Sequence, residues 1–141
     1  MKRLRSEKGA ALLEAAITVP IILLISVGIF EFGKAYQTWQ VLTNASREGA
    51  RFAVIEGTTD ADVRKRVGDY LKAGGLKAIA DDAITVNRSV ALTATSTGSQ
   101  IQINYPFKFM VLNPVVRLIS PTDTKTGAPI TMVAATVMRN E

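Results

Sequence analysis

The feature that most limits what this chain can fold into is an apolar stretch of 21 residues, from Ala10 to Phe30. Its single charged side chain is that of Glu14. As a helix rising about 1.5 Å per residue, the stretch is roughly 31 Å long, which matches the hydrocarbon core of a bilayer. No other segment of the sequence is both apolar enough and long enough to do the same. The sequence therefore predicts a helix that spans a membrane or joins an assembly of such helices.

The positive charge of the chain is concentrated ahead of this stretch. Residues 1–9 hold one acidic side chain and four basic ones, while the rest of the chain is nearly balanced, within an overall net charge of +5. A nucleic-acid-binding protein spreads its basic groups over a folded face, so we expect no nucleic-acid partner. The positive-inside bias instead places the N-terminus in the cytoplasm and the residues beyond about 31 across the membrane.

The composition also argues against catalysis. The chain has neither cysteine nor histidine, which excludes disulfides and thiolates and removes the commonest general base. A metal site would need oxygen ligands alone, and the adjacent Asp81 and Asp82 lack the spacing of an EF-hand loop. We find no glycine-rich phosphate loop and no nucleophile elbow in the sequence. We therefore expect no enzyme, no cofactor and no metal site.

Three interpretations compete for the basic leader and the apolar stretch: a cleaved signal peptide, an uncleaved signal anchor, and a leader cut ahead of the apolar helix. A signal peptide has an apolar core of about 7–15 residues followed by a small-x-small cleavage site. The apolar core is longer here, and the one suitable triplet, Gly33-Lys34-Ala35, lies where the helical pattern continues. The pattern therefore favours the other two interpretations.

Glu14 distinguishes between those two. A carboxylate at this depth costs on the order of 1–3 kcal/mol. One explanation is that it reaches back to the headgroups. The other is that cleavage after Gly9 creates an ammonium group at Ala10, and that Glu14 is neutralised by this amine or by that of a neighbouring subunit.

The residues around Gly9 resemble the processing site of type IV pilin-like proteins, in which a prepilin peptidase cuts after a glycine and glutamate is the fifth mature residue. A longer resemblance covers about the first 55 residues and is to the TadE-like pseudopilins of Tad (tight adherence, Flp-type, type IVc) pilus systems. The segments that carry it are GAALLEAA at 9–16, VP at 19–20, GIFEFGKA at 28–35 and SREGAR at 46–51.

The resemblance implies a minor pilin or pseudopilin that a prepilin peptidase processes between Gly9 and Ala10. Such a protein takes part in the assembly or initiation of an adhesive pilus, with Glu14 setting the charge registry between subunits. The implied partners are the peptidase, other pilins and pseudopilins, the inner-membrane assembly platform and the lipid bilayer. The implied location is the cytoplasmic membrane, crossed once, with the C-terminal domain outside or carried into the pilus. The alternative is an uncleaved, signal-anchored binding module, in which Gly9 and Glu14 have no role.

Pro20 lies in the middle of the apolar stretch, where it removes the hydrogen bond to the carbonyl of Ala16. Membrane helices tolerate proline when a nearby hydroxyl such as that of Thr18 satisfies the freed carbonyl. The kink is either without consequence or a hinge that lets the subunit pass from bilayer to filament.

The helical pattern continues beyond Phe30 to about Ile55. An aromatic stripe opens with Phe32, Tyr36 and Trp39, and the last two are predicted as membrane-interface anchors. A second stripe of small residues, around Ala45–Ala53, permits another element to approach closely. We therefore expect a leader at 1–9, a transmembrane helix at 10–30, its continuation at 31–57 and a domain at 58–141.

The remaining sequence predicts one further helix followed by a sheet. Thr59 is expected to begin the helix and Gly74-Gly75 to end it, with one more turn at 76–80. A further short helix is expected from Asn113-Pro114 to Ile119.

Strands are indicated by two alternating runs, at 84–93 and 101–109, and by a final apolar run at 130–138. Pro106 suggests an edge position or a bulge, and the final run, apolar on both faces, suggests a central strand. The predicted fold is α+β, with a small antiparallel sheet packed on the long helix as in pilins.

Overall fold

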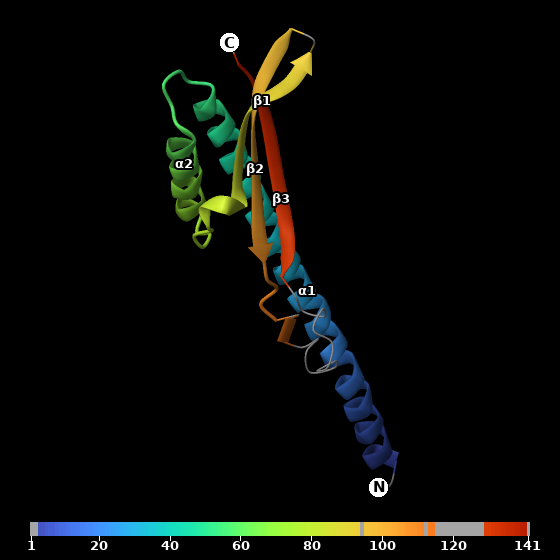
Figure 1. Cartoon of the computed structure of the whole chain (residues 1–141). Helices are drawn as coiled ribbons and strands as arrows, with labels where there is room; N and C mark the ends of the chain where they lie inside the picture. Colours follow the sequence, from blue (N-terminus) through green and yellow to red (C-terminus); the bar gives the residue numbers. More distant parts are fainter. Residues whose placement is uncertain (1–2, 94, 112, 115–128, 141) are drawn as a thin grey trace, which may run out of the picture. The chain divides into compact units, whose positions relative to one another are not determined.

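The computed structural model describes residues 3–93, 95–111, 113–114 and 129–140, with side chains from residue 7 onward. It consists of two α-helices, a 3₁₀ turn and three strands (Figure 1): α1 (Arg3–Ala53), α2 (Asp60–Ala73), η1 (Asp81–Ala83), β1 (Ile84–Thr93), β2 (Ser96–Phe107) and β3 (Ile130–Arg139). The predicted α+β class, with a long N-terminal helix, a shorter helix and a small sheet, is confirmed.

The chain forms two compact units, which we describe separately. The first unit combines Met1–Lys34 with Phe109–Gly127. The second combines Ala35–Lys108 with Ala128–Glu141. The N-terminal part of α1 thus belongs to the first unit and its C-terminal part to the second.

α1 is longer at its start, and slightly shorter at its end, than the predicted range from Ala10 to about Ile55. It begins within the leader at Arg3 and ends at Ala53. The chain then turns at Gly57, whose φ of 80° lies in the left-handed region that favours glycine. The backbone N–H of Thr58 donates to the carbonyl of Ile55 at 3.4 Å and closes this turn.

α2 begins as predicted, with Thr59 as its N-cap. The Thr59 side chain accepts a hydrogen bond from the backbone N–H of Asp62, and the Asp62 carboxylate accepts one from the backbone N–H of Thr59, which together form a capping box. The helix turn expected at 76–80 is wrong. Gly75, with a φ of 78°, turns the chain out of the helix, and the short turn forms later, at η1.

The sheet is antiparallel with the order β1-β2-β3, so β2 is the central strand and the prediction that the final strand is central is wrong. On β3 only Ala134 is buried among the apolar residues, while Val133 and Val137 are exposed. β2 pairs with β1 along one edge and with β3 along the other. Beyond the Ile84–Ile103 pair β1 has ended, so Pro106 pairs with β3 alone and occupies the edge position that its missing N–H requires.

The core of the second unit forms where α1 presents small residues, as predicted. Ala45, Ser46 and Ala50 on α1 are fully buried. A Cβ placed on Gly49 would lie 2.5 Å from Cγ2 of Val67 on α2 and 3.4 Å from Cγ2 of Ile101 on β2. The absence of a side chain at Gly49 therefore allows both α2 and β2 to pack against the helix.

The sheet also contacts α1 through a polar pair, because the hydroxyls of Ser46 and Thr136 are 2.7 Å apart. The aromatic stripe, in contrast, is not part of the core, since Phe32, Tyr36 and Trp39 are all exposed. Of the short helix expected from Asn113, residues 113–114 are helical, and the remainder lies outside the described residues.

Candidate functional site

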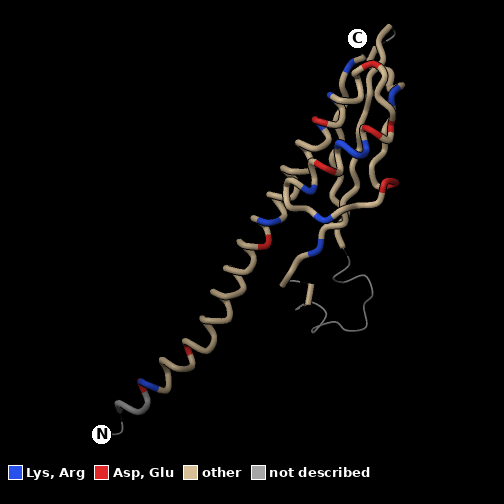
Figure 2. The backbone as a smooth tube through the Cα atoms, turned by 90° about the vertical axis from the view of Figure 1, so that its left-hand side faces the viewer, with Lys and Arg blue, Asp and Glu red and all other residues tan. Residues whose placement is uncertain are grey.

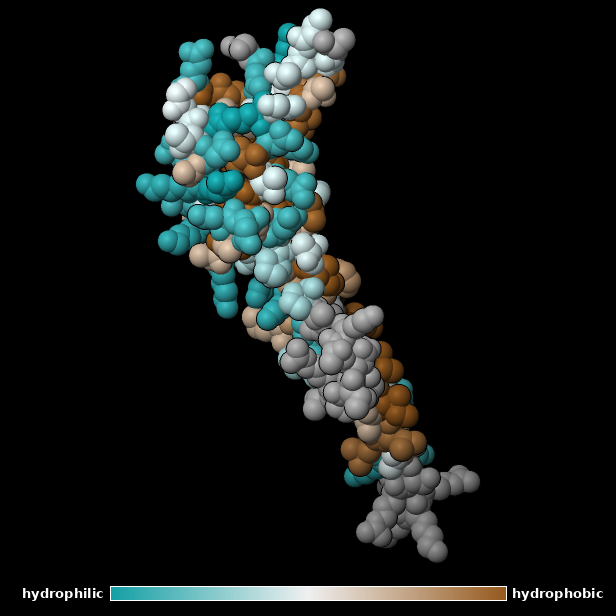
Figure 3. Space-filling model, in the orientation of Figure 1, coloured by the Kyte–Doolittle hydropathy of each residue, from teal (hydrophilic) through white to brown (hydrophobic). Residues whose placement is uncertain are grey.

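The N-terminal part of α1 exposes almost all of its apolar side chains. Leu12, Ile22 and Phe30 are 72%, 56% and 80% exposed. Figure 2 shows that charged residues are sparse along this part of the helix and dense over the second unit, and Figure 3 shows hydrophobic side chains along the same part of α1. Within the described residues, α1 is the one helix long and apolar enough to cross a membrane. An apolar surface of this extent marks a site of contact with a membrane or with another protein.

The two residues of the predicted cleavage site lie in regular helix. Gly9 and Ala10 are exposed, and a Cβ on Gly9 would meet no atom within 4 Å. Glu14 is also exposed. Ala10 and Glu14 are four residues apart, which along a helix corresponds to a rise of about 6 Å, a little over one turn. Cleavage after Gly9 would therefore place an amine within about two turns of the Glu14 carboxylate, and both roles stay predictions.

α1 continues through Pro20 without a break in its helical assignment. Six residues further on, the hydroxyl of Ser26 donates to the carbonyl of Ile22 at 2.8 Å. This bond does not involve the carbonyl of Ala16, which Pro20 leaves without its usual partner, so the compensation expected from Thr18 stays a prediction. The role of Pro20 as a hinge stays a prediction.

The two predicted interface anchors lie side by side on α1. The rings of Tyr36 and Trp39 are tilted by 41° with centroids 6.3 Å apart. The amide of Gln40 donates to the Tyr36 hydroxyl at 2.7 Å, which fixes the polar end of that ring. An exposed aromatic pair with one polar end is suited to a membrane–water interface, and this role also stays a prediction.

Glu31 is a functional candidate that the sequence reasoning missed. It is the first charged residue after the apolar stretch, and it is 3% exposed. Its carboxylate accepts hydrogen bonds from the backbone N–H groups of Met110, at 3.0 Å, and of Val111. The ring of Phe32 meets the ring of Phe109 edge-on, with centroids 6.5 Å apart. The segment 109–111 is therefore held against one turn of α1 within the first unit.

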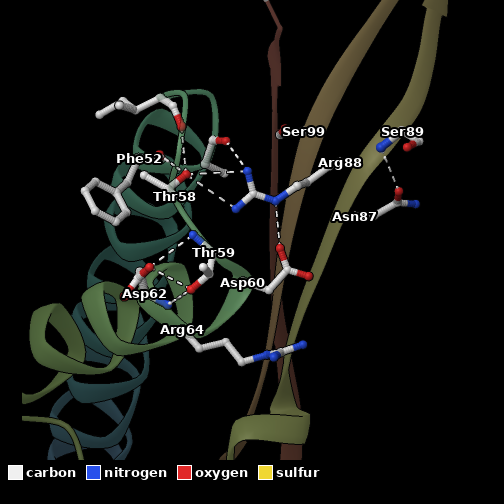
Figure 4. A network of polar contacts seen from close by, with 12 residues as sticks. Phe52, Thr58, Thr59, Asp60, Asp62, Arg64, Asn87, Arg88, Ser89 and Ser99 are labelled. Carbon is white, nitrogen blue, oxygen red and sulfur yellow. Dashed lines mark hydrogen bonds and ion pairs between the residues drawn. The ribbon is translucent and has the colours of Figure 1, made fainter.

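Arg88 is the second functional candidate that the sequence reasoning did not single out. It lies at a bulge in β1, where the pairing with β2 shifts between Asn87 and Val90. Its guanidinium donates to Asp60 Oδ1 and to the carbonyl of Ala53, each at 2.7 Å (Figure 4). Arg88 thereby connects the end of α1 to the start of α2.

The chain end secures the same bulge. The side-chain amide of Asn140 donates to the carbonyl of Arg88 at 3.0 Å, and its oxygen accepts from the Ser99 hydroxyl at 2.8 Å. The bulge, the central strand and the end of β3 are therefore joined by one polar network, whose role is to fix the fold.

Close to this network, the pKa of the Asp62 carboxylate is shifted. The hydroxyl and backbone N–H of Thr59 both donate to the Asp62 carboxylate and hold the pKa of Asp62 below its usual value. Among the residues that the structure describes, no three acidic side chains gather closely enough to hold a metal ion. The chemically distinctive groups therefore lie along α1 and its contacts.

Comparison with known proteins agrees with the features of α1. Residues 9–51 match the family model described as TadE-like protein. No curated protein and no solved structure matches the chain. The matched segment begins at Gly9, ends within the last turn of α1, and contains the apolar helix, Glu14, Glu31 and the small-residue face. TadE-like proteins are structural components of Tad pilus systems and not an enzyme family. Over residues 9–51 the chain is therefore similar to TadE-like proteins, as the resemblance in its sequence predicted.

Proposed function

We propose that this chain is a minor pseudopilin of a Tad-type adhesive pilus, cut after Gly9 by a prepilin peptidase. The observation that carries the proposal is that the TadE-like match begins at Gly9 itself. Gly9 lies on an exposed helical turn with open space around its Cα, so a peptidase meets no side-chain obstacle there. Cleavage at this position would remove the basic leader, residues 1–9.

After cleavage, the apolar half of α1 retains the protein in the cytoplasmic membrane. The basic leader favours a cytoplasmic N-terminus and an extracytoplasmic location for the residues that follow the span. Tyr36 and Trp39 lie one to two turns past Phe30, at the depth of an interfacial aromatic belt. In assembly, the exposed leucine and isoleucine side chains of α1 pack against other pilins or pseudopilins instead of lipid.

Glu14 provides registry in that packing. In an apolar environment a carboxylate is stable only when it is paired, and the ammonium group at Ala10 of the same or a neighbouring subunit is the nearest new cation that cleavage creates. Where the amine belongs to the neighbouring subunit, a shift of one subunit along the other leaves both charges unpaired. The assembly platform in the inner membrane is the partner that would bring subunits together, and Pro20 would let the helix bend during transfer.

The first experiment is the mass and N-terminal sequence of the protein extracted from its native membrane. A mature chain that starts at Ala10 supports the proposal. The variant Gly9→Leu should keep its leader, whereas Gly28→Leu, which also has open space around its Cα, should be cut normally. A chain that still starts at Met1 in cells with an active prepilin peptidase contradicts the proposal and favours the signal-anchored binding module.

The role of Glu14 needs a second experiment. Glu14→Leu and Glu14→Gln should both be cut normally yet fail to co-purify with other pseudopilins, because each lacks the charge that pairs with the amine. Pilus assembly that survives unchanged in both variants would show that the registry role is wrong.

A further inference from the structure

Glu31 and the segment that it binds form a local structure that a spanning helix does not need. The carboxylate is 3% exposed and accepts two consecutive backbone N–H groups, those of Met110 and Val111. Two charge-assisted bonds of this kind are strong and directional. They fix the segment 109–111 at the turn of α1 that directly follows the apolar stretch.

The arrangement exposes apolar side chains from two distant parts of the sequence. Phe30 and Phe32 on α1 are 80% and 69% exposed, and Met110 and Val111 are 65% and 41% exposed. We refer to these four residues as the apolar collar. The edge-on contact of Phe32 with Phe109 links the two parts of the collar. Phe30 and Phe32 flank Glu31 in the sequence, and Met110 and Val111 are bonded to it, so all four exposed side chains belong to one level of α1. Exposed apolar side chains of this size suit an interaction surface.

The position of the collar along α1 indicates its partner. The apolar stretch ends at Phe30, after about 31 Å of helix, so Phe32 lies only about 3 Å further along the axis. This is the depth at which hydrocarbon gives way to headgroups and where aromatic side chains accumulate. Lys34 follows after two residues and is exposed, which suits the phosphate groups of lipids.

The polar groups of the site fit the same environment. Water is scarce at the boundary of the hydrocarbon, so backbone N–H groups there need partners within the protein. Met110 and Val111 find theirs in Glu31, and the carboxylate in turn is compensated by the two donors. The apolar side chains of the segment can then enter the interface without carrying unsatisfied main-chain donors with them.

We propose that the apolar collar docks into the interfacial region of the phospholipid bilayer and gives the protein a second membrane contact beside its spanning helix. Glu31 is the positioning residue of this contact. The inference rests on the membrane anchoring in the proposed function, although it does not depend on cleavage or pilus assembly.

The test uses the full chain in vesicles of phosphatidylcholine and phosphatidylglycerol at a low protein-to-lipid ratio. Because the chain has no cysteine, one introduced cysteine takes one environment-sensitive fluorophore. Three variants are compared: Ile22→Cys in the span, Met110→Cys in the collar and Val133→Cys on β3. All three positions are about half exposed or more, at 56%, 65% and 51%. Spin labels at shallow or deep positions of the lipid chains report the depth of each fluorophore.

We expect the label at position 22 to be quenched by the deep spin label, the label at 110 by the shallow one, and the label at 133 by neither. Adding Glu31→Ala should abolish the quenching at 110 while leaving that at 22 unchanged, and Glu31→Gln, which keeps one acceptor oxygen, should give an intermediate loss. Glu56→Ala, an exposed carboxylate beyond the end of α1, is the control and should change nothing.

Each other outcome overturns the proposal in a recognisable way. If position 22 is quenched and position 110 behaves like 133, the helix is anchored and the collar does not bind lipid. If position 22 is not quenched either, the membrane anchoring itself is wrong and the collar proposal falls with it. If the fluorophore at 110 reports an apolar environment only as protein density rises, and neither spin label quenches it, the collar binds a second copy of the chain instead of lipid.

Discussion

The two halves of α1 have the same secondary structure and opposite surroundings. In the N-terminal half, large side chains such as that of Leu24 are 60% exposed, while in the C-terminal half Leu42 is fully buried. The N-terminal half is built from large apolar residues that form a broad surface for lipid or other helices. The C-terminal half places small residues at its contact face, so that a helix and a sheet approach its backbone. One continuous helix therefore serves two kinds of packing, and residue size separates them.

The largest expected effect comes from shortening a buried leucine in the C-terminal half of α1, and the same change at an exposed leucine in the N-terminal half serves as the comparison. Leu42→Ala should lower the free energy of unfolding of the second unit by about 2–5 kcal/mol, because it leaves a cavity in a fully buried site. Leu24→Ala should change it by less than about 0.5 kcal/mol. Denaturant unfolding in detergent micelles, followed by circular dichroism, measures both. An equal loss of unfolding free energy in the two variants would show that the two halves of α1 do not differ in their packing.

The next effect concerns the polar network that ends the buried half. Arg88→Met removes the bonds to Asp60 and to the carbonyl of Ala53, and should cost about 2 kcal/mol, since bonds to charged groups contribute about 1.5–3 kcal/mol each and the side chain is partly exposed. Arg66→Met is the matched control, because Arg66 pairs with Glu48 on the surface and should cost no more than about 1 kcal/mol. If the two variants unfold alike, Arg88 does not organise the fold.

A third prediction sharpens the role of small residues. Gly49→Ala places a Cβ against Val67 and Ile101 and should destabilise the second unit by about 1–3 kcal/mol. Gly68→Ala, inside α2 with no atom within 4 Å, should stabilise it by about 0.5–1 kcal/mol. We expect the thermal unfolding temperatures of the two variants to shift in opposite directions. A stabilised Gly49→Ala variant would show that the close packing at this face is unnecessary.

The smallest effect is at the cap of α2. Thr59→Ala should cost about 1 kcal/mol at neutral pH. The folded pKa of Asp62 is depressed by its bonds to Thr59, so the capping box contributes stability above the ordinary aspartate pKa of about 3.9, and this contribution is lost as the pH falls through the lower folded value.

The stability difference between the wild type and Thr59→Ala should therefore shrink below about pH 4. Unfolding measured from pH 7 downward checks this expectation. A difference that grows on acidification would contradict it.

Much of the buried half could be predicted from its sequence, because periodicity and residue size act locally. The stripe from Ala45 to Ala53 indicated a close contact, and Thr59 indicated the start of α2. The order of the strands was harder to predict. The final strand is apolar on both faces, which usually marks a central position, yet β3 is an edge and β2 occupies the centre. Pairing order is a property of the whole sheet, and the residue pattern of a single strand does not carry that information.

Glu31 and Arg88 were missed for a related reason. Their partners lie 79 and 28 positions away in the chain, at Met110 and Asp60, so that no local pattern indicates them. A signal did exist in both cases: Glu31 directly follows the apolar stretch, and Arg88 lies between Val86 and Val90 on one face of a strand. A charge in such a place requires a partner, and the useful question to ask of the sequence is where that partner lies.

The bond between Ser46 and Thr136 has a consequence for synthesis. Its two residues are 90 positions apart, so at about 5–20 residues per second the ribosome needs roughly 5–18 s to make β3 after that turn of α1 has formed. α2 and the hairpin of β1 and β2 are made earlier, but throughout this interval the part of the contact face around Ser46 lacks its partner on β3. Because Ala45, Ser46 and Gly49 offer little apolar area, we expect this face to form few non-native contacts before β3 is made.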